Sequence, residues 1–194
     1  MDLQQLYTDL ILEYNRDKTN KRKVEAPTVH EHGHNPSCGD DIDVEVKVEG
    51  GIIKDLAYTG TGCAISQAST AMMAELLQDR TVDEAIRLCK LFLAMIRGDV
   101  KDEAALEELE AAYTLKDISQ MPVRVKCATL GWHTLEVALE KSLLTWKINK
   151  AIKKHLFPLV RASAFLFTRY PNRHKREGRS IFPRCRSVPI YRLS

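Results

Sequence analysis

The chain has 194 residues, 44% of them hydrophobic, so it can bury a core and form one domain with an appendage. It has no run of about 18 apolar residues, and its start lacks the basic and apolar segments of an export signal, so we expect neither a transmembrane segment nor secretion. Five scattered cysteines without such a signal indicate metal ligands, reactive thiols or core residues of a cytoplasmic protein, not disulfides.

The net charge of +3 hides a strong asymmetry along the chain. Residues 145–194 contain 13 Lys or Arg and one acidic residue, Glu177, which gives that stretch about +12. The other 16 basic and 25 acidic residues give residues 1–144 about −9. Such a split indicates two parts with different partners, or a tail of different origin.

The first half of the chain predicts a helix, a loop and a β-hairpin. Apolar residues at three- and four-residue intervals over 3–14 predict an amphipathic helix. Residues 27–41 are rich in His, Pro, Gly and Asn, and we expect an irregular loop there. Alternating Ile and Val over 42–48 predict a half-buried strand, Gly50-Gly51 a tight turn, and residues 52–58 the returning strand.

The second half predicts helices. One is expected from Ala64 to Leu77, and the sequence Thr81-x-x-Glu84 is a capping box that opens the next, which ends at Gly98. A short acidic helix over 101–112 follows, and a last helix begins at Pro122.

These elements indicate an α+β fold over residues 1–143, in which a small antiparallel sheet (hairpin 42–58, with room for one more strand) packs against several helices. Residues 144–194 form a basic extension that we expect to be disordered or loosely helical. Leu144 to Leu156 has the spacing of a basic amphipathic helix, which Pro158 should break. The extension could bind an anionic membrane or nucleic acid, or it could have no evolved function. We favour an extension without an evolved function. No nucleic-acid partner is expected for the body.

Three cysteines lie where the chain is predicted to change direction: Cys38 before the first strand, Cys63 after the second, and Cys127 in the first turns of the last helix. Such positions can converge at one end of a small domain, and a helix N-terminus lowers the pKa of a nearby thiol. With the carboxylate of Asp40 they could complete a tetrahedral shell that suits zinc or iron. Their spacing matches no compact metal signature, so incidental or buried cysteines are an equal alternative on spacing alone.

Other candidate residues have simpler interpretations. His30, His32 and His34 alternate before Cys38, but the sequence suggests no acid or cysteine to complete a metal shell, so a solvated loop is favoured. Cys89 lies on the apolar face of its helix and is interpreted as a core thiol. The sequence offers no partner for Cys185, and His133 is expected to point away from Cys127.

Three segments carry a family resemblance. Asn35-Pro-Ser-Cys-Gly-Asp40, Thr59-Gly-Thr-Gly-Cys-Ala-Ile-Ser-Gln-Ala-Ser-Thr-Ala-Met-Met73 and Arg124-Val-Lys-Cys-Ala-Thr-Leu-Gly-Trp-His-Thr-Leu135 resemble the three motifs of the U-type iron–sulfur assembly proteins. The chain is similar to the SufU branch of Gram-positive bacteria in two respects. Lys126 stands where the IscU branch has a histidine, and residues 98–121 fit the SufU insertion. The resemblance covers about residues 1–143.

The resemblance implies zinc ligands at Cys38, Asp40, Cys63 and Cys127, and a SufS-type PLP-dependent cysteine desulfurase as partner. In proteins of this type the thiol at the position of Cys38 accepts persulfide sulfur while a desulfurase histidine replaces it on zinc. The sulfur then passes to a downstream SUF assembly scaffold or to apo-protein acceptors. The chain would thus activate the desulfurase and would not be a stand-alone enzyme. The alternatives are a scaffold for a [2Fe–2S] cluster, with iron on the same ligands, and a purely structural zinc domain.

Overall fold

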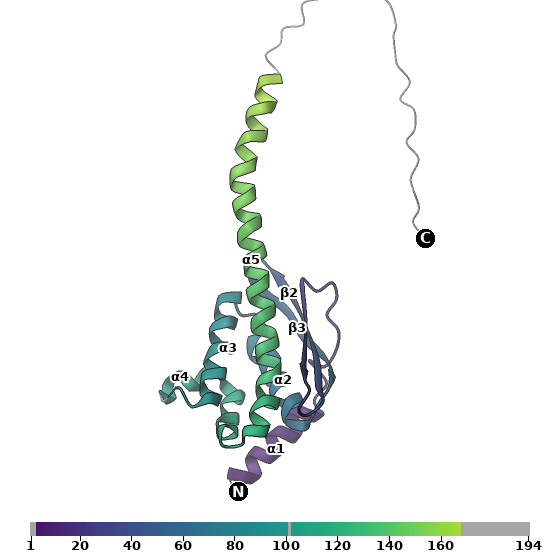
Figure 1. Ribbon diagram of the computed structural model, residues 1–194, viewed down its shortest axis with the longest axis vertical. Coiled ribbons are helices and arrows are strands. Elements are labelled where there is room, and N and C mark those ends of the chain that lie inside the picture. Colours follow the sequence, from purple (N-terminus) through teal and green to yellow (C-terminus); the bar gives the residue numbers. More distant parts are fainter. Residues whose placement is uncertain (1–2, 101, 168–194) are drawn as a thin grey trace, which may run out of the picture. The chain divides into compact units, whose positions relative to one another are not determined.

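The computed structural model describes residues 3–100 and 102–167, with side chains for residues 8–100 and 102–144 (Figure 1). The elements are α1 (Leu3–Arg16), β1 (Val29–Asn35), β2 (Asp40–Glu49), β3 (Ile52–Thr61), α2 (Ala64–Leu77), α3 (Val82–Arg97), α4 (Glu103–Glu107), the 3-10 helix η1 (Glu110–Gln120) and α5 (Pro122–Phe167). The predicted α+β class is confirmed. The chain divides into two compact units, one ending at Ala151 and the other beginning at Ile152.

The sheet has three antiparallel strands in the order β1-β2-β3. The predicted hairpin is β2 and β3, and Gly50 and Gly51 form its turn with φ values of +61° and +84°, which favour glycine. Burial alternates along β2: Ile42, Val44 and Val46 are fully buried while the residues between them are partly exposed. One face of the sheet therefore meets the helices.

Strand β1 replaces the irregular loop that we predicted over residues 27–41. Its residues pair with β2 from Val29↔Val46 to Asn35↔Asp40. The hydrophobic alternation is missing because the inward positions include Gly33, where an added Cβ would clash with Thr134 on α5. Val29 is the one apolar side chain that β1 packs against the core, and Gly33 packs by close backbone approach, so the period-two pattern gave no signal.

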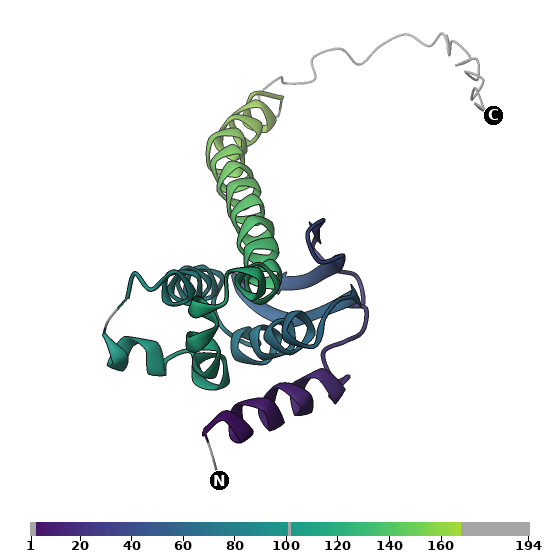
Figure 2. The same ribbon diagram turned by 60° about the horizontal axis from the view of Figure 1, so that its bottom comes forward.

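The helices form the other side of the core. Helix α2 contacts β3 and also α1 (Figure 2). Helix α5 meets α3 through Trp132, whose ring stacks on Phe92 with a centroid distance of 4.0 Å. Trp132 Nε1 donates to Ser69 Oγ on α2 at 3.0 Å, and this hydroxyl donates to the Ala128 carbonyl at 2.7 Å. This buried network fixes the start of α5 against α2.

The predicted ends of α2 and α3 are confirmed, whereas the acidic segment that follows does not form the predicted single helix. Thr81 and Glu84 form the capping box of α3, and Gly98 ends it with φ +76°. The acidic helix expected over 101–112 is interrupted by Glu110, which adopts φ +49°, so α4 is short and η1 follows. The predicted break at Pro158 is wrong: the backbone of α5 stays helical to Phe167, although an interior proline removes one helix hydrogen bond.

Candidate metal centre

The candidate centre lies where the β1–β2 turn, the β3–α2 junction and the first turns of α5 meet. One potential ligand atom each from Cys38, Asp40 and Cys127 lies within 4.8 Å of the other two. Asp40 and Cys127 are each 1% exposed, whereas Cys38 is exposed. Residues 89 positions apart in the sequence are thus brought together, with one thiol accessible from outside.

The turn that carries Cys38 is organised by Asn35. The Asn35 side-chain carbonyl accepts from the Ser37 amide at 3.1 Å, and its backbone carbonyl accepts from the amides of Gly39 at 2.9 Å and Cys38 at 3.3 Å. Gly39 has φ +73°, which favours glycine at this position. This compact turn holds the Cys38 thiol, which donates to the Asn35 carbonyl at 3.9 Å, beside Asp40 at the start of β2.

Asp40 occupies the inner face of β2, where a charged group needs partners. Its Oδ1 accepts from the Cys63 amide at 2.8 Å, while its buried Oδ2 has no hydrogen-bond partner among the described residues. Burial raises the pKa of Asp40, but interactions with the Cys38 thiol, the Cys63 amide and the Cys127 thiol outweigh it and lower the pKa overall. An ionised oxygen without a partner, next to two thiols, fits a metal ligand.

Cys63 is the N-cap of α2, and its Sγ accepts from the Ser66 amide at 3.4 Å. It is not in the set within 4.8 Å, although its amide binds Asp40 and its side chain interacts with Cys127. Cys63 therefore borders the three-residue set from the N-terminus of α2.

Cys127 closes the centre from the side of α5. Its thiol donates to the Val123 carbonyl at 3.7 Å. Burial, followed by interactions with the nearby Cys38 and Asp40 side chains, raises the pKa of the Cys127 thiol. Without a metal this thiol is protonated at neutral pH, and a metal would have to displace its proton.

Two features near the centre were missed by sequence reasoning. Ser66, in the first turn of α2, is fully buried and its Oγ has no hydrogen-bond partner among the described residues. Its only sequence signal is its place three residues after Cys63.

The other feature that sequence reasoning missed lies on the opposite face of the sheet, where Asp41 and Asp43 contact the histidines of β1. The expectation that no acid lies near these histidines is wrong, because it assumed that β1 is a loop.

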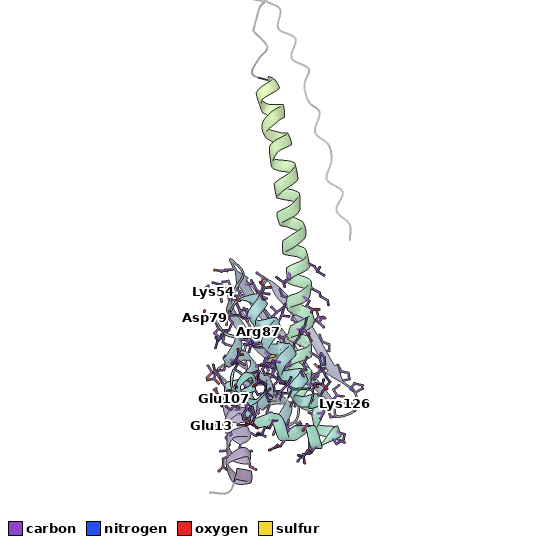
Figure 3. All side chains as sticks on the ribbon, turned by 90° about the vertical axis from the view of Figure 1, so that its left-hand side faces the viewer. Glu13, Lys54, Asp79, Arg87, Glu107 and Lys126 are labelled. Carbon is purple, nitrogen blue, oxygen red and sulfur yellow. The ribbon has the colours of Figure 1, made fainter. Side chains whose placement is uncertain are left out.

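Other candidate residues stand apart from the centre. Lys126 is exposed and lies at the periphery of the unit (Figure 3). His133 is exposed on α5 beside Glu136, at 3.5 Å, as its spacing predicts. Cys89 is fully buried and burial raises its pKa, which confirms the core thiol. Cys185 lies outside the described residues.

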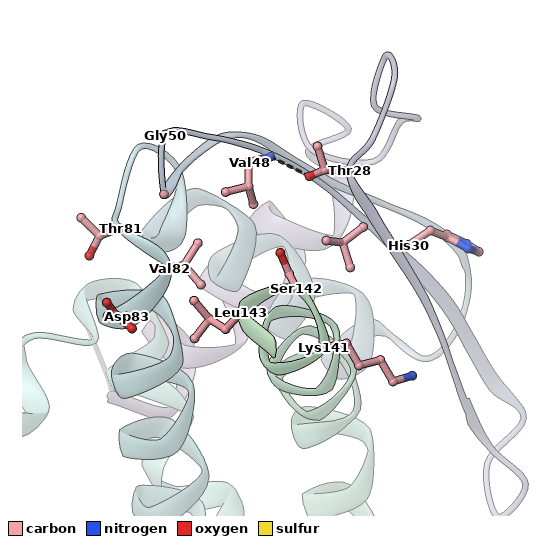
Figure 4. Close-up of a pocket in the computed structure, with 12 residues that line it drawn as sticks. Thr28, His30, Val48, Gly50, Thr81, Val82, Asp83, Lys141, Ser142 and Leu143 are labelled. Atoms are coloured by element: carbon pink, nitrogen blue, oxygen red, sulfur yellow. Dashed lines mark hydrogen bonds between the residues drawn. The ribbon is translucent and has the colours of Figure 1, made fainter. Parts of the chain in front are cut away.

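A pocket of about 770 Å³ lies beside the β2–β3 turn (Figure 4). It is lined by the β2–β3 turn, the start of α3 and Lys141, Ser142 and Leu143 of α5. None of its lining residues is a cysteine. In the described part of the chain, no helix has both the length and the apolar character needed to cross a bilayer.

The fold and the centre define an α+β protein with a cysteine–aspartate cluster at one end of its sheet. Residues 6–147 match the family described as the NifU-like N terminal domain, and the chain belongs to this family.

Among curated relatives, it is 40% identical over 141 residues to the iron–sulfur cluster assembly scaffold protein IscU of Thermotoga maritima, covering 73% of this chain and 97% of the relative. It is 34% identical over 141 residues to the zinc-dependent sulfurtransferase SufU of Bacillus subtilis, covering 72% and 93% respectively. The predicted IscU- and SufU-like character is thereby confirmed.

Solved structures are also similar to this chain. A putative iron–sulfur cluster assembly scaffold protein for the SUF system from Fervidobacterium islandicum is 38% identical, with a TM-score of 0.63, and covers 70% of this chain and 97% of that one. A NifU-like N-terminal structure from Brucella abortus, at 18% identity and a TM-score of 0.62 over 72% and 96% of the chains, supports the fold alone.

Proposed function

We propose that this chain acts in iron–sulfur cluster assembly as a zinc-bound sulfur acceptor, taking persulfide sulfur onto Cys38 from a SufS-type PLP-dependent cysteine desulfurase. The proposal rests first on unequal exposure within the cluster: Cys38 is exposed, whereas Asp40 and Cys127 are 1% exposed. A partner can reach Cys38 while the buried residues stay in place. A cytoplasmic location, where cysteines stay reduced, is part of this proposal.

Cys38, Asp40, Cys63 and Cys127 are the proposed zinc ligands. The buried, unpartnered Oδ2 of Asp40 and the neighbouring thiols supply the oxygen and sulfur donors that zinc binds. Bound zinc would keep the thiols deprotonated without adding redox chemistry. Cys63 supports this role from the N-terminus of α2, where its own backbone already holds Asp40.

The transfer step is a thiol exchange. The Cys38 thiolate attacks the terminal sulfur of the desulfurase persulfide, forming a new S–S bond at Cys38. The S–S bond of the desulfurase breaks, and its electron pair leaves on the desulfurase cysteine as a thiolate. Cys38 then carries the persulfide and no external oxidant or reductant is required. The sulfur passes on to a downstream SUF assembly scaffold or to apo-protein acceptors.

The second candidate function is a scaffold on which a [2Fe–2S] cluster is assembled and transferred. The relative from Thermotoga maritima carries the name of such a scaffold, and thiolates hold both zinc and iron–sulfur clusters. We favour the sulfur acceptor because Lys126 is an exposed lysine beside Cys127, at a position where the cluster-binding branch would supply an imidazole. A colourless protein with one zinc supports the acceptor, and a brown protein with visible absorption supports the scaffold.

The deciding experiment incubates the zinc-loaded chain with a SufS-type desulfurase and cysteine, then measures alanine release and maps persulfide by mass spectrometry. One added sulfur on Cys38 and faster alanine release are expected. Cys38→Ser should fold normally by circular dichroism but neither gain sulfur nor stimulate the desulfurase. Ser37→Ala, an exposed neighbour in the same turn, is the matched control and should behave like the parent. Unfolding of Cys38→Ser would instead indicate a structural zinc domain.

A further inference from the structure

The outer face of the β1–β2 hairpin carries three histidines and two aspartates. His30, His32 and His34 alternate along β1, and Asp41 and Asp43 alternate along β2. The strand register places His32 opposite Asp43 and His34 opposite Asp41. Side chains at alternate and directly opposed positions share one face of a sheet, so all five groups meet there.

The contacts form a continuous row. Asp43 Oδ1 lies 3.1 Å from His30 Nε2 and 3.1 Å from His32 Nδ1. Asp41 Oδ2 lies 3.7 Å from His32 Nε2 and 3.4 Å from His34 Nδ1. His32 thus bridges both carboxylates, and one potential ligand atom each from His32, Asp41 and Asp43 lies within 4.8 Å of the others.

The charge of this row is not balanced by ordinary ion pairs. No described lysine or arginine lies within ion-pair distance of Asp41 or Asp43; their ion-pair partners are the imidazoles alone. Neutral imidazoles, the form that binds metals, leave the two carboxylates with a charge of about −2. A divalent cation would neutralise this charge, bound through one nitrogen of His32 and one oxygen of each carboxylate.

The row is separate from the cysteine centre and from the pocket. Asp40 and Asp41 are consecutive on β2, so their side chains point to opposite faces: Asp40 is buried among the thiols, and Asp41 is 45% exposed on the outside. Figure 4 shows the His30 ring directed away from the pocket that it borders. A ligand on the row would therefore occupy neither of the other two places.

We propose that this row is a second metal site, which binds Zn²⁺ through His32, Asp41 and Asp43, with either His30 or His34 as the fourth ligand. Imidazole and carboxylate donors suit zinc. Zinc–ligand bonds of about 2.1 Å place the ligand atoms of a tetrahedral shell about 3.4 Å apart. The ligand atoms of His32, Asp41 and Asp43 lie within 4.8 Å of one another, so they must move closer by about an ångström. The three imidazoles are each about half exposed, which leaves them free to move.

The site binds zinc more weakly than a thiolate centre, because its ligands are exposed, lack thiolate charge and lose rotamer freedom on binding. Bound zinc would tie β1 to β2 beside the turn that carries Cys38. This inference does not depend on sulfur transfer, since it concerns different atoms on the other face of the sheet.

The test measures bound zinc in the full chain, in a Cys185→Ser background that removes a thiol outside the described residues. The protein is loaded with one equivalent of ZnCl2 and titrated calorimetrically with more ZnCl2, and bound zinc is counted by mass spectrometry after dialysis against fixed free zinc. A second, weaker ion is expected in the parent. His32→Ala and Asp43→Asn should each lower its affinity by about tenfold or more, while the first ion is retained.

His133→Ala is the matched control, because it removes an exposed imidazole that also lies beside a carboxylate, on α5. It should keep the second ion with unchanged affinity. Circular dichroism checks that each variant is folded, and Asp43→Asn preserves the shape of the side chain. The proposal is overturned if the parent binds no second zinc, if both row variants bind it as the parent does, or if His133→Ala loses it equally.

Discussion

At the residue scale, the cysteines of the described chain differ in access to solvent. Cys38 is exposed in a turn, Cys127 is nearly buried, and Cys89 is fully buried in the core. Burial raises the pKa of both Cys127 and Cys89. Since the thiolate is the reactive form, burial and a raised pKa should both slow the reactions of Cys127 and Cys89, whereas Cys38 is accessible to reagents.

Alkylation of the metal-free protein tests this ranking. Iodoacetamide should modify Cys38 first, Cys127 more slowly, and Cys89 only after unfolding in urea, as followed by peptide mass spectrometry at neutral pH. One equivalent of zinc added beforehand should slow the modification of Cys38 but leave Cys89 unchanged. Equal rates for Cys38 and Cys89 in the folded protein would contradict the burial seen here.

A second residue-scale contact fixes the segment before β1. Arg22 donates to both carboxylate oxygens of Asp55 on β3, at 2.6 Å and 3.0 Å. These hydrogen bonds hold the pKa of Asp55 below its ordinary value of 3.8. A carboxylate with a lowered folded pKa stabilises the fold above its unfolded pKa, and this stability is lost as the pH falls through the folded pKa.

Asp55→Asn should therefore lower the free energy of unfolding at pH 6 by less than about 1 kcal/mol, because the pair is partly exposed to solvent. The difference from the parent should shrink once the pH falls below 3.8. Urea unfolding across this pH range measures it. In an Arg22→Gln background the same substitution should cost almost nothing at pH 6, and an undiminished cost there would assign the effect to another partner.

At the scale of elements, the cysteine centre depends on how closely α5 approaches α2. A Cβ added to Gly131 would lie 2.5 Å from Thr70 Oγ1, so only glycine allows this approach. The same region holds the Trp132–Ser69–Ala128 hydrogen bonds. Cys127 precedes it by one helical turn, so a displaced α5 would carry this thiol away from Asp40.

Gly131→Ala should destabilise the protein by about 1–3 kcal/mol, the usual cost of overpacking, despite the better helix propensity of alanine. In a Thr70→Ala background, which removes the obstructing hydroxyl and methyl groups, the cost should fall to about zero. Urea unfolding of the four proteins gives the coupling between the two sites. An equal cost in both backgrounds would mean that Thr70 is not the obstacle.

Some helices and strands could be predicted from local sequence patterns, and others could not. The β2–β3 hairpin was predictable from period-two alternation and Gly50-Gly51, and the start and end of α3 from its caps. Strand β1 was not, because its inward position at Gly33 is packed by the backbone approach of α5. The break at Glu110 was not predictable either, since nothing in an acidic sequence marks a positive φ.

At the scale of the whole molecule, the charge asymmetry coincides with the division of the chain into units. The buried hydrophobic residues of the described chain run from Ile11 to Leu139, all within the unit that ends at Ala151. The excess of basic residues follows this core, and the separate role of residues 144–194 stays a prediction. The core therefore should not need the chain beyond Ala151.

Truncation after Ala151 tests this independence. The shortened chain should melt within about 4 °C of the full chain, corresponding to less than about 1 kcal/mol, and retain one zinc. Its net charge changes to about −7, since Lys147 and Lys150 add two to the −9 of residues 1–144. It should fail to bind a cation-exchange resin at pH 7 that retains the full chain. A much lower melting temperature would show that the removed segment supports the core.

The sequence by itself determined the fold class, the hairpin and most helices, and it named the candidate ligands, because local periodicity, caps and three family-like motifs are written in consecutive residues. Only the tertiary structure decided which of these residues meet. It placed Cys38, Asp40 and Cys127 within 4.8 Å of one another and left Cys63 beside them. It also gave Cys38 the exposed position.

The histidine row also shows which features came from the sequence and which only from the tertiary structure. Its residues were visible in the sequence, but their carboxylate neighbours came from the register between β1 and β2. Hydrophobic alternation and turn geometry specify register, and β1 offered no such alternation because Gly33 packs against α5 by close backbone approach.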